Sequence, residues 1–266
     1  MTNSGLMNLL NIGKKLAKEN GFYWTFLYFL YWSSRFFLKI DLQGLYRTLI
    51  QLEEKRNLPG FNTPATAADI WDLLPWEKER GEEWTVSAEW KKSLIEDVLF
   101  TYIKTGSVVL EIGPGAGRWT EVLQPQAREL LAVDVSAKAI DLCKKRFSSA
   151  TNINFFLTQN ASLGFIPDKS IEAIWSFDVF VHINPGDTDS YLSEFKRVLV
   201  PGGVAVIHHP KDGGQHGGCR SRVTALRFAT LLEKHGLTLV RQFDSWGENG
   251  KFNLSRYGDC ISVFTA

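Results

Sequence analysis

The feature that most constrains this chain is a short apolar run, Val108–Ile112, that leads directly into the glycine-rich sequence GPGAG at 113–117. The residues that follow, up to about 125, have the pattern of a helix. A strand, a glycine-rich turn and a helix form the unit with which open parallel sheets bind nucleotides, because glycine has no Cβ atom and lets the backbone approach a ligand. The pattern therefore predicts an α/β domain with a nucleotide-type cofactor beside its first strand.

The spacing of the glycines distinguishes this loop from two other phosphate-binding loops. A GxGxxG motif that begins at Gly113 requires a third glycine at 118, where the chain has Arg118, and no Lys-Ser/Thr pair follows as in a P-loop. Instead, Glu111 stands at the end of the first apolar run and Asp134 at the end of the next. A carboxylate in the second of these positions can accept hydrogen bonds from a ribose diol.

Short apolar runs alternate with helical patterns through residues 105–266. Five runs have the length and composition of buried parallel strands, at 108–112, 130–133, 153–157, 171–177 and 204–207. Helices are expected at about 117–125, 137–148, 188–199 and 221–235. The last two runs, 237–243 and 260–264, are joined by a polar loop without a helix, so we expect this pair to be antiparallel. The sequence therefore predicts a three-layer α/β domain.

Several motifs in this order resemble the class I S-adenosylmethionine-dependent methyltransferases. They are EIGPGAG at 111–117, Asp134, Asn160-Ala161, WSFDVFVHI at 175–183 and LVPGGVAVI at 199–207. The resemblance covers about residues 105–266. It implies a Rossmann-like, seven-stranded, mostly parallel sheet with an antiparallel last strand, preceded here by an N-terminal helical region. It also implies S-adenosyl-L-methionine as the cofactor and S-adenosyl-L-homocysteine as the product.

The resemblance also assigns roles to individual residues. It implies that the glycine loop holds the methionine end of the cofactor, that Asp134 binds the ribose hydroxyls, that Asn160 meets the adenine amine and that Ala161 lies against the adenine ring. The complete set of predicted cofactor-binding residues is Glu111, Gly113, Pro114, Gly115, Gly117, Trp119, Asp134, Val135, Asn160, Ala161 and Phe177.

Candidates for catalysis follow the fourth and fifth predicted strands, because ligands of open α/β sheets lie beyond the carboxyl ends of the strands. His182 follows the fourth strand, and His208 and His209 follow the fifth. Imidazole titrates near neutrality, which suits a base that takes the proton of an acceptor hydroxyl. We predict His182 as the base and keep His208 and His209 as alternatives, one of which anchors the acceptor instead. Asp178 either orients a histidine, contacts the cofactor amine through water or has a structural role.

The loop at 211–222 (KDGGQHGGCRSR) contains four glycines and is predicted to be a mobile lid, with a plain connector as the alternative. In the lid, Arg220 or Arg222 would meet an anionic group of the acceptor. Cys219 is expected to be inert, and the three cysteines of the chain form no CxxC pair, which favours a reducing, cytoplasmic location. The histidines lack a cluster of further ligands, so we predict no metal site.

Residues 1–104 are predicted to form an aromatic-rich helical cap that precedes the methyltransferase domain at 105–266. Residues 22–32 are apolar except for Thr25, but Arg35 and two serines fall within the window of about 20 residues that a spanning helix requires. Six basic and two acidic residues give the first 50 positions a net charge of +4. The segment therefore packs on the neighbouring domain or in a homodimer, makes peripheral membrane contact through residues 22–40, or spans the membrane, in that order of preference.

The charge of the whole chain is +1, which argues against nucleic acid as a partner, since binding to nucleic acid depends on neutralising phosphates. The sequences GEEWTVSAEW at 81–90 and EIGPGAGRW at 111–119 resemble bacterial methyltransferases found with glycan assembly. We therefore predict a methyltransferase that O-methylates a sugar or glycan-linked intermediate. The alternatives are a small-molecule N- or O-methyltransferase of secondary metabolism and a non-catalytic, cofactor-binding partner subunit.

Overall fold

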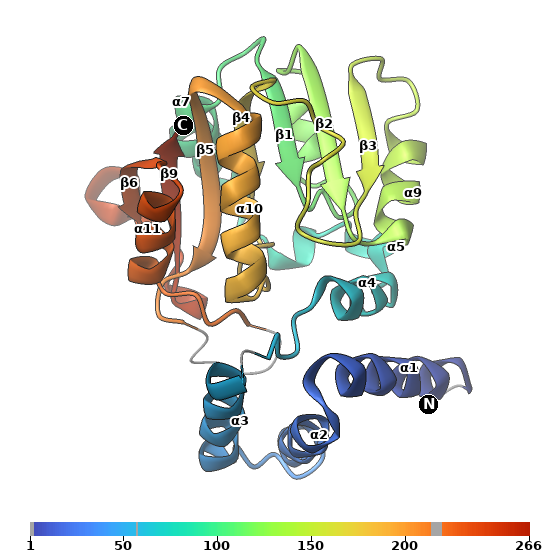
Figure 1. The fold of residues 1–266 in the computed structure, drawn as a ribbon. Coiled ribbons are helices and arrows are strands. Elements are labelled where there is room, and N and C mark those ends of the chain that lie inside the picture. The colour runs from blue at the N-terminus through green and yellow to red at the C-terminus, as the bar shows by residue number, and fades with distance from the viewer. Residues whose placement is uncertain (1–2, 57, 214–219) are drawn as a thin grey trace.

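The computed structural model describes residues 3–56, 58–213 and 220–266. In these residues, seven strands form one sheet in the order β3-β2-β1-β4-β5-β9-β6 (Figure 1). The strands are β1 Val108–Ile112, β2 Glu129–Asp134, β3 Ile153–Leu157, β4 Ile171–Ser176, β5 Leu199–Pro210, β6 Thr238–Phe243 and β9 Asp259–Thr265. Strands β1 to β5 pair in parallel, whereas β9 lies antiparallel between β5 and β6. The predicted fold class is confirmed.

The helices begin where the sequence provides caps. Ser136 accepts a hydrogen bond from the backbone of Ala139 at the start of α9 (Ala137–Arg146), and Thr224 caps α11 (Ala225–Lys234) in the same way. Helix α10 (Pro185–Val198) begins with Asn184 as its cap and a proline in its first turn. The predicted helices at 117–125 and 221–235 are shorter in the structure. Helix α8 covers only Thr120–Leu123, and α11 begins at Ala225 because Thr224 caps it there.

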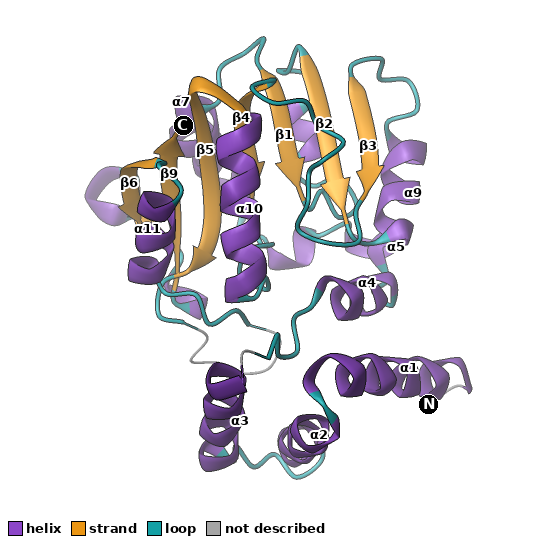
Figure 2. Ribbon diagram, viewed as in Figure 1, coloured by secondary structure: helices purple, strands orange, loops and turns teal. Residues whose placement is uncertain are grey.

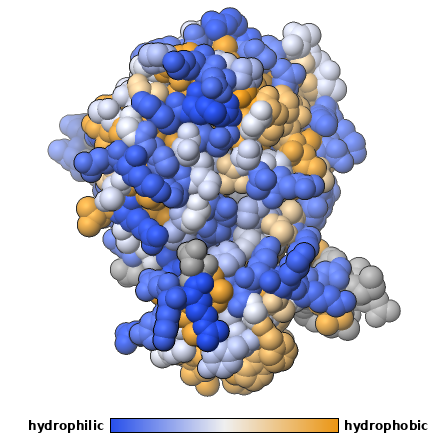
Figure 3. All heavy atoms as spheres, in the orientation of Figure 1, coloured by the Kyte–Doolittle hydropathy of each residue, from blue (hydrophilic) through white to orange (hydrophobic). Residues whose placement is uncertain are grey.

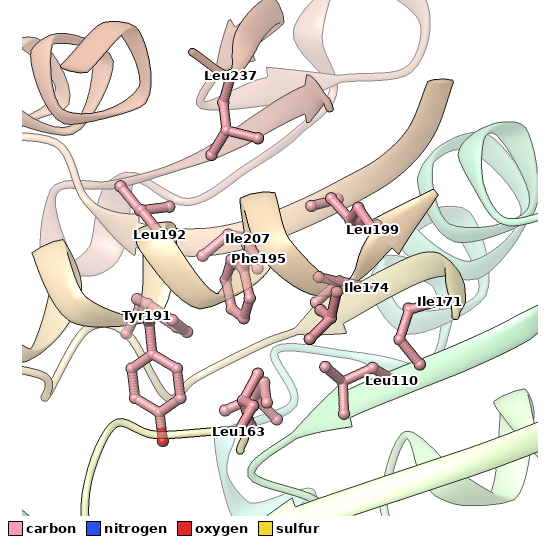
Figure 4. Packing of buried hydrophobic residues seen from close by; sticks show 14 of the residues in the cluster. Leu110, Leu163, Ile171, Ile174, Tyr191, Leu192, Phe195, Leu199, Ile207 and Leu237 are labelled. Carbon is pink, nitrogen blue, oxygen red and sulfur yellow. The ribbon is translucent and has the colours of Figure 1, made fainter. Parts of the chain in front are cut away.

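Helices flank the sheet on both sides (Figure 2). An apolar cluster lies on each of its two faces. On one face, Tyr191 and Phe195 of α10 pack against Leu110, Ile174 and Ile207 of the central strands (Figure 4). The other face is rich in tryptophan and includes Trp90, Trp119, Trp175 and Trp246. Neighbouring residues of β1 point to opposite sides, as the pleat of a strand requires.

The helical segment at 88–102 is part of this second cluster. It comprises α6 (Ala88–Ser93), a π-helical turn η2 (Leu94–Leu99) and α7 (Phe100–Tyr102). A small hairpin of β7 (Ser245–Trp246) and β8 (Phe252–Asn253) closes over it, and the Trp246 indole donates a hydrogen bond to Ser93 Oγ (2.9 Å). Apolar packing therefore continues across residue 104, where the sequence predicts the division between the two regions.

The first three helices form a separate small unit. They are α1 (Asn3–Asn20), α2 (Phe22–Phe36) and α3 (Gln43–Arg56), and their buried residues make a cluster of their own around Leu16, Trp24 and Tyr31. Figure 1 places this unit beyond the carboxyl ends of the parallel strands, with α4 (Pro64–Asp72) and α5 (Trp76–Glu79) between it and the sheet. Among the helices of the described residues, none combines the length and apolarity needed to cross a bilayer.

Candidate active site

A cavity of about 330 Å³ lies at the carboxyl ends of β1, β2, β4 and β5. Of the residues predicted from the sequence, those that line it are Gly113, Pro114, Gly115, Trp119, Asp134, Val135, Phe177, His182 and His208. Those outside its lining are Glu111, Gly117, Asn160, Ala161 and His209. The cavity therefore brings together the glycine loop, the acid of the second strand and two of the three candidate histidines.

The glycine loop is built around two close approaches by side chains. Gly113 has φ +74°, and a Cβ atom there would lie 2.3 Å from Val179 Cγ2. Gly117 has φ +93°, and a Cβ atom there would lie 2.6 Å from the ring of Phe147. The sequence predicts that these glycines allow the approach of a ligand. At both positions the missing Cβ makes room for a side chain of the protein itself, Val179 or Phe147, and of the two glycines only Gly113 lines the cavity.

Asp134 lies on the cavity wall, where backbone groups hold its carboxylate. The N–H of Gly115 donates to one oxygen (3.1 Å) and the N–H of Ser136 to the other (2.9 Å). Burial raises the pKa of Asp134 to about 6, although these hydrogen bonds oppose the shift. Each oxygen keeps a further lone pair, so the carboxylate fits the two hydroxyls of a ribose.

Glu111 links the end of β1 to the start of α8. Its side chain is buried, and Oε2 accepts a hydrogen bond from Thr120 Oγ1 (2.7 Å) at the start of α8. Oε1 is also buried and has no hydrogen-bond partner among the described residues. Burial raises the pKa of Glu111 to about 8, so the side chain is protonated near neutrality. It therefore holds the loop and the following helix together and does not face the cavity.

The two residues predicted to contact adenine do not line the cavity. Asn160 is exposed, and its Oδ1 accepts a hydrogen bond from the backbone N–H of Ser162 (2.9 Å), which closes a local turn. Ala161 is buried in the apolar cluster that covers one face of the sheet. Their role toward the adenine ring stays a prediction.

A chain of alternating charges lines part of the cavity. Its members, in order, are Arg118, Asp178, His208, Asp259 and Arg220. His208 Nδ1 lies 3.2 Å from the Asp178 carboxylate, and His208 Nε2 lies 3.4 Å from that of Asp259. The two arginines form ion pairs with the outer sides of the same carboxylates. Each carboxylate is thus placed between an arginine and the imidazole.

This arrangement shifts two of the pKa values. Burial opposes ionisation of Asp178, but the hydrogen bonds and charges of His208 and Arg118 outweigh it and hold the pKa of Asp178 well below its ordinary value. Burial alone would lower the pKa of His208, yet Asp178 and Asp259 raise it above the ordinary value. Asp178 also has φ +62°, a left-handed conformation that its contacts in the chain maintain. Of the three roles left open for Asp178, its contact with His208 supports the orientation of a histidine.

The three candidate histidines occupy different environments. His182 lines the cavity, half-buried, with its ring edge-on to Trp71 at 5.0 Å between ring centroids. His208 is 2% exposed and stacks on Phe177 at 4.2 Å. His209 is fully buried outside the cavity. It stacks on Phe228, and its Nε2 is 2.7 Å from Ser262 Oγ.

Burial lowers the pKa of His209 to about 3. Because the side chain cannot reach the cavity and remains neutral in the core, the prediction of His209 as a base or anchor is wrong.

Most of the tryptophan-rich wall of the cavity was not predicted from the sequence. Four tryptophans before the first strand line the cavity, namely Trp71, Trp76, Trp84 and Trp90. The Trp76 indole donates to the carbonyl of Trp71 (2.7 Å), and its ring lies edge-on to that of Trp84. The stretch 69–97 mixes these tryptophans with many charged residues, a pattern typical of a solvated surface. The signal that pointed to a site was the density of indole rings, which is unusual for such a surface.

The predicted lid at 211–222 is described only in part, and Cys219 lies outside the described residues. Both arginines that were predicted to meet an anion are engaged with carboxylates. Arg220 pairs with Asp259, and Arg222 pairs with Glu53 of α3 at 2.5 Å. Arg222 therefore connects this loop to the N-terminal helices. A role as anion ligand is supported for neither arginine.

Comparisons with known proteins agree with this geometry. Residues 109–203 match a family model described as a methyltransferase domain. The chain is 31% identical over 154 residues to a demethylmenaquinone methyltransferase of Tropheryma whipplei, covering 57% of this chain and 59% of the relative. It is 30% identical over 146 residues to a putative O-methyltransferase of Mycobacterium avium, covering 50% of this chain and 63% of the relative.

Among solved structures, the fold is similar to that of an S-adenosylmethionine-dependent methyltransferase from Aquifex aeolicus. The TM-score is 0.51 at 20% sequence identity, over 66% of this chain and 96% of that chain. The chain spans about 60% of the length of the curated relatives named above. Sheet order, glycine loop, strand-end acid and family match together define a class of protein. That class is the proteins with a methyltransferase domain, which the family model matches over residues 109–203, in a fold similar to that of S-adenosylmethionine-dependent methyltransferases.

Proposed function

We propose that this protein transfers the methyl group of S-adenosyl-L-methionine to a hydroxyl oxygen of a small-molecule acceptor. The observation that carries the proposal is the single cavity that joins two kinds of wall. One wall is formed by Gly113, Gly115 and Asp134, and the other by His182 and the tryptophans. A methyltransferase needs this combination, because the methyl donor and the acceptor must meet within one enclosed space.

The residues on the first wall fit the cofactor. The backbone of Gly113 and Gly115 lines the cavity, and Asp134 presents a carboxylate held by two backbone donors. When bound there, S-adenosyl-L-methionine supplies an electrophilic methyl group on a sulfonium. The contribution of the chain is to fix the ribose and the methionine portion so that this methyl group faces the second wall.

The second wall fits an acceptor with apolar faces and hydroxyl groups. Four indole rings provide flat apolar surfaces, and His182, Asp178 and Arg220 provide polar groups between them. Aromatic rings with a few polar groups are the usual lining of a site that orients a small ligand. We propose a sugar or glycan-linked acceptor, whose C–H faces stack on indole rings. A flat aromatic acceptor is the second candidate, favoured by the same four rings.

Of the two histidines on the cavity, we assign the base to His182. His208 Nδ1 accepts a hydrogen bond from the backbone N–H of Asp178 (3.1 Å), and Nε2 is buried 3.4 Å from the carboxylate of Asp259. These contacts hold His208 and Asp178 together, so we assign His208 a positioning role. His182 borders the cavity beside Trp71 and is placed to take the proton of an acceptor hydroxyl as the methyl group arrives.

Two measurements test the proposal. Calorimetry with S-adenosyl-L-homocysteine should show that Asp134→Ala weakens binding by about 1–3 kcal/mol, the range for hydrogen bonds lost to a charged group. Asp141→Ala, an exposed carboxylate on α9, is the matched control and should leave the affinity unchanged. A transfer screen with methyl-labelled cofactor against sugars, lipid-linked saccharides, phenols and amines then identifies the acceptor. Unchanged affinity in Asp134→Ala, or transfer to amines alone, would contradict the proposal.

A further inference from the structure

Helix α2 is apolar on both of its faces. Trp24, Tyr28 and Tyr31 point into the small core of the N-terminal unit and are at most 8% exposed. On the other side, Phe22 is 80% exposed and Phe26 50%. A helix of a globular protein ordinarily presents polar residues to solvent on the face opposite its core. The outer face of α2 therefore lacks a partner within the described part of the chain.

The exposed apolar surface continues beyond the helix. We define the aromatic patch as the exposed side chains of Phe22, Tyr23, Phe26, Leu30, Phe36, Phe37, Leu38, Ile40 and Leu42. Figure 3 shows hydrophobic side chains gathered at the lower end of the molecule, where Figure 1 places α2 and the segment that follows it. Monomeric proteins rarely expose a contiguous apolar surface of this kind unless it contacts a partner or a membrane.

The N-terminal unit that carries the aromatic patch is basic. Lys14 and Lys18 of α1, Lys39, and Arg47 of α3 are exposed, and they form no ion pair with the residues that the structure describes. Lys39 lies over the ring of Phe36, with its Nζ 5.6 Å from the ring centroid, so one of these cations is part of the patch itself. Exposed aromatic side chains flanked by cations match the chemistry of an interface with anionic lipids.

We propose that the aromatic patch docks this protein onto the surface of an anionic lipid bilayer. The charge of the unit argues against a second copy of the chain as the occupant. The first 50 residues carry a net charge of +4, so two such faces brought together would repel. Attraction to an anionic bilayer surface instead contributes about 1 kcal/mol to binding for each Lys or Arg close to that surface.

The position of the N-terminal unit gives this docking a consequence for the site. A second, small cavity of about 40 Å³ separates the unit from the α/β domain and is lined by aromatic residues including Trp24, Tyr28 and Phe61. Asn62 and Arg220 line this cavity and the larger one. Docking through α2 thus places the acceptor side of the molecule near the bilayer. The inference does not depend on the proposed reaction, since lipid binding is measured without cofactor or acceptor.

The test is co-sedimentation of the full chain with vesicles. We expect binding to phosphatidylcholine vesicles that contain about 30 mol% phosphatidylglycerol, weak binding to pure phosphatidylcholine, and a loss of affinity as salt rises from about 0.05 to 0.5 M. The double variant Phe26→Ser with Phe37→Ser should bind at least about tenfold more weakly. Leu226→Ser, which removes a 79% exposed leucine from α11, is the matched control and should bind as the parent does.

Charge-reversal variants separate the electrostatic contribution to lipid binding from the contribution of the apolar side chains. Lys18→Glu with Lys39→Glu should abolish the preference for anionic vesicles, whereas Lys144→Glu on α9 should retain it. Analytical ultracentrifugation and circular dichroism of the same samples should show folded monomers. Equal binding to both kinds of vesicle, unchanged binding of the double phenylalanine variant, or a dimer that this variant dissociates would each overturn the proposal.

Discussion

The α/β domain and the three N-terminal helices place their aromatic residues in opposite ways. In the domain, Trp175, Phe195 and Phe264 are completely buried between the sheet and its helices. In the N-terminal unit, a few aromatic residues form a small core while Phe22 and Phe37 remain 80% and 63% exposed. The domain thus buries these apolar side chains within its own core. The comparison shows that the domain buries these aromatic residues internally, whereas the outer face of α2 stays exposed among the described residues.

The largest effect that we expect tests whether a residue of the α/β domain acts as the base. His182→Ala should lower the rate constant by about 10² to 10⁴, the usual value of general-base assistance, and should remove the limb of the pH–rate profile near neutrality. Cofactor affinity should stay nearly unchanged, because Asp134 and the glycine loop are intact. Steady-state kinetics over a range of pH values are the measurement.

His235→Ala, a histidine paired with Asp189 at the end of α11, is the control for this substitution. His208→Ala should mainly raise the Michaelis constant for the acceptor, as expected for a positioning residue. If His182→Ala keeps both the rate and the pH limb, the base lies elsewhere and orientation of the reactants carries the reaction.

The second expected effect compares the two cores. Leu110 is fully buried at the centre of the sheet, so Leu110→Ala should cost about 2–5 kcal/mol of the free energy of unfolding. Phe26→Ala removes an exposed ring and should change it by less than about 0.5 kcal/mol. Urea denaturation measures both. A large cost for Phe26→Ala would show that the outer face of α2 has a partner within the chain.

The strands of the domain could be predicted from sequence because each is a short, locally readable apolar run. The β7–β8 hairpin and the π-helical turn at 94–99 could not, because both depend on contacts made elsewhere. The indole of Trp246 reaches Ser93 across the fold, and no local pattern in either segment indicates this contact. Residues 88–102 were predicted only as part of the helical cap, whereas in the structure they pack on the sheet.

The cofactor side of the site was predicted better than the acceptor side for a related reason. Gly113 and Asp134 belong to motifs at the ends of neighbouring strands, so sequence order alone places them together. The charge chain instead depends on the antiparallel register that sets β9 beside β5, with Pro210 opposite Asp259. Register of that kind is fixed by tertiary packing, so the pairing of His208 with Asp259 was not visible in the sequence.

A pH dependence of stability should come from the domain and from Glu111 in particular. Burial raises the pKa of Glu111 from its ordinary value of 4.5 to about 8, so between these values the folded state holds a proton that the unfolded state has released. The free energy of unfolding should therefore fall as pH rises through this window, by up to about 1.4 kcal/mol per pH unit. Glu111→Gln should remove this contribution, so that the variant gains stability relative to the parent at high pH.

Denaturation at pH 6 and pH 8.5 measures the effect. Glu233→Gln, an exposed residue on α11, is the control and should follow the parent at both pH values. If Glu111→Gln and the parent lose stability in parallel as pH rises, Glu111 ionises in the folded state as readily as in the unfolded chain.

The smallest effect concerns the contact between the two regions. Glu53 of α3 is buried, accepts a hydrogen bond from the indole of Trp24 (3.1 Å) and pairs with Arg222 (2.5 Å). Burial raises the pKa of Glu53 although Arg222 opposes the shift.

Arg222→Ala should cost about 1–3 kcal/mol at pH 8, where the carboxylate is left buried without its cation. The cost should be smaller at pH 5, because without Arg222 the carboxyl takes up a proton more readily and the neutral form needs no cation. Hydrogen exchange in α3 and urea denaturation at both pH values measure it, with the exposed Arg227→Ala as control. Equal costs at the two pH values would mean that Arg222 contributes packing and not charge.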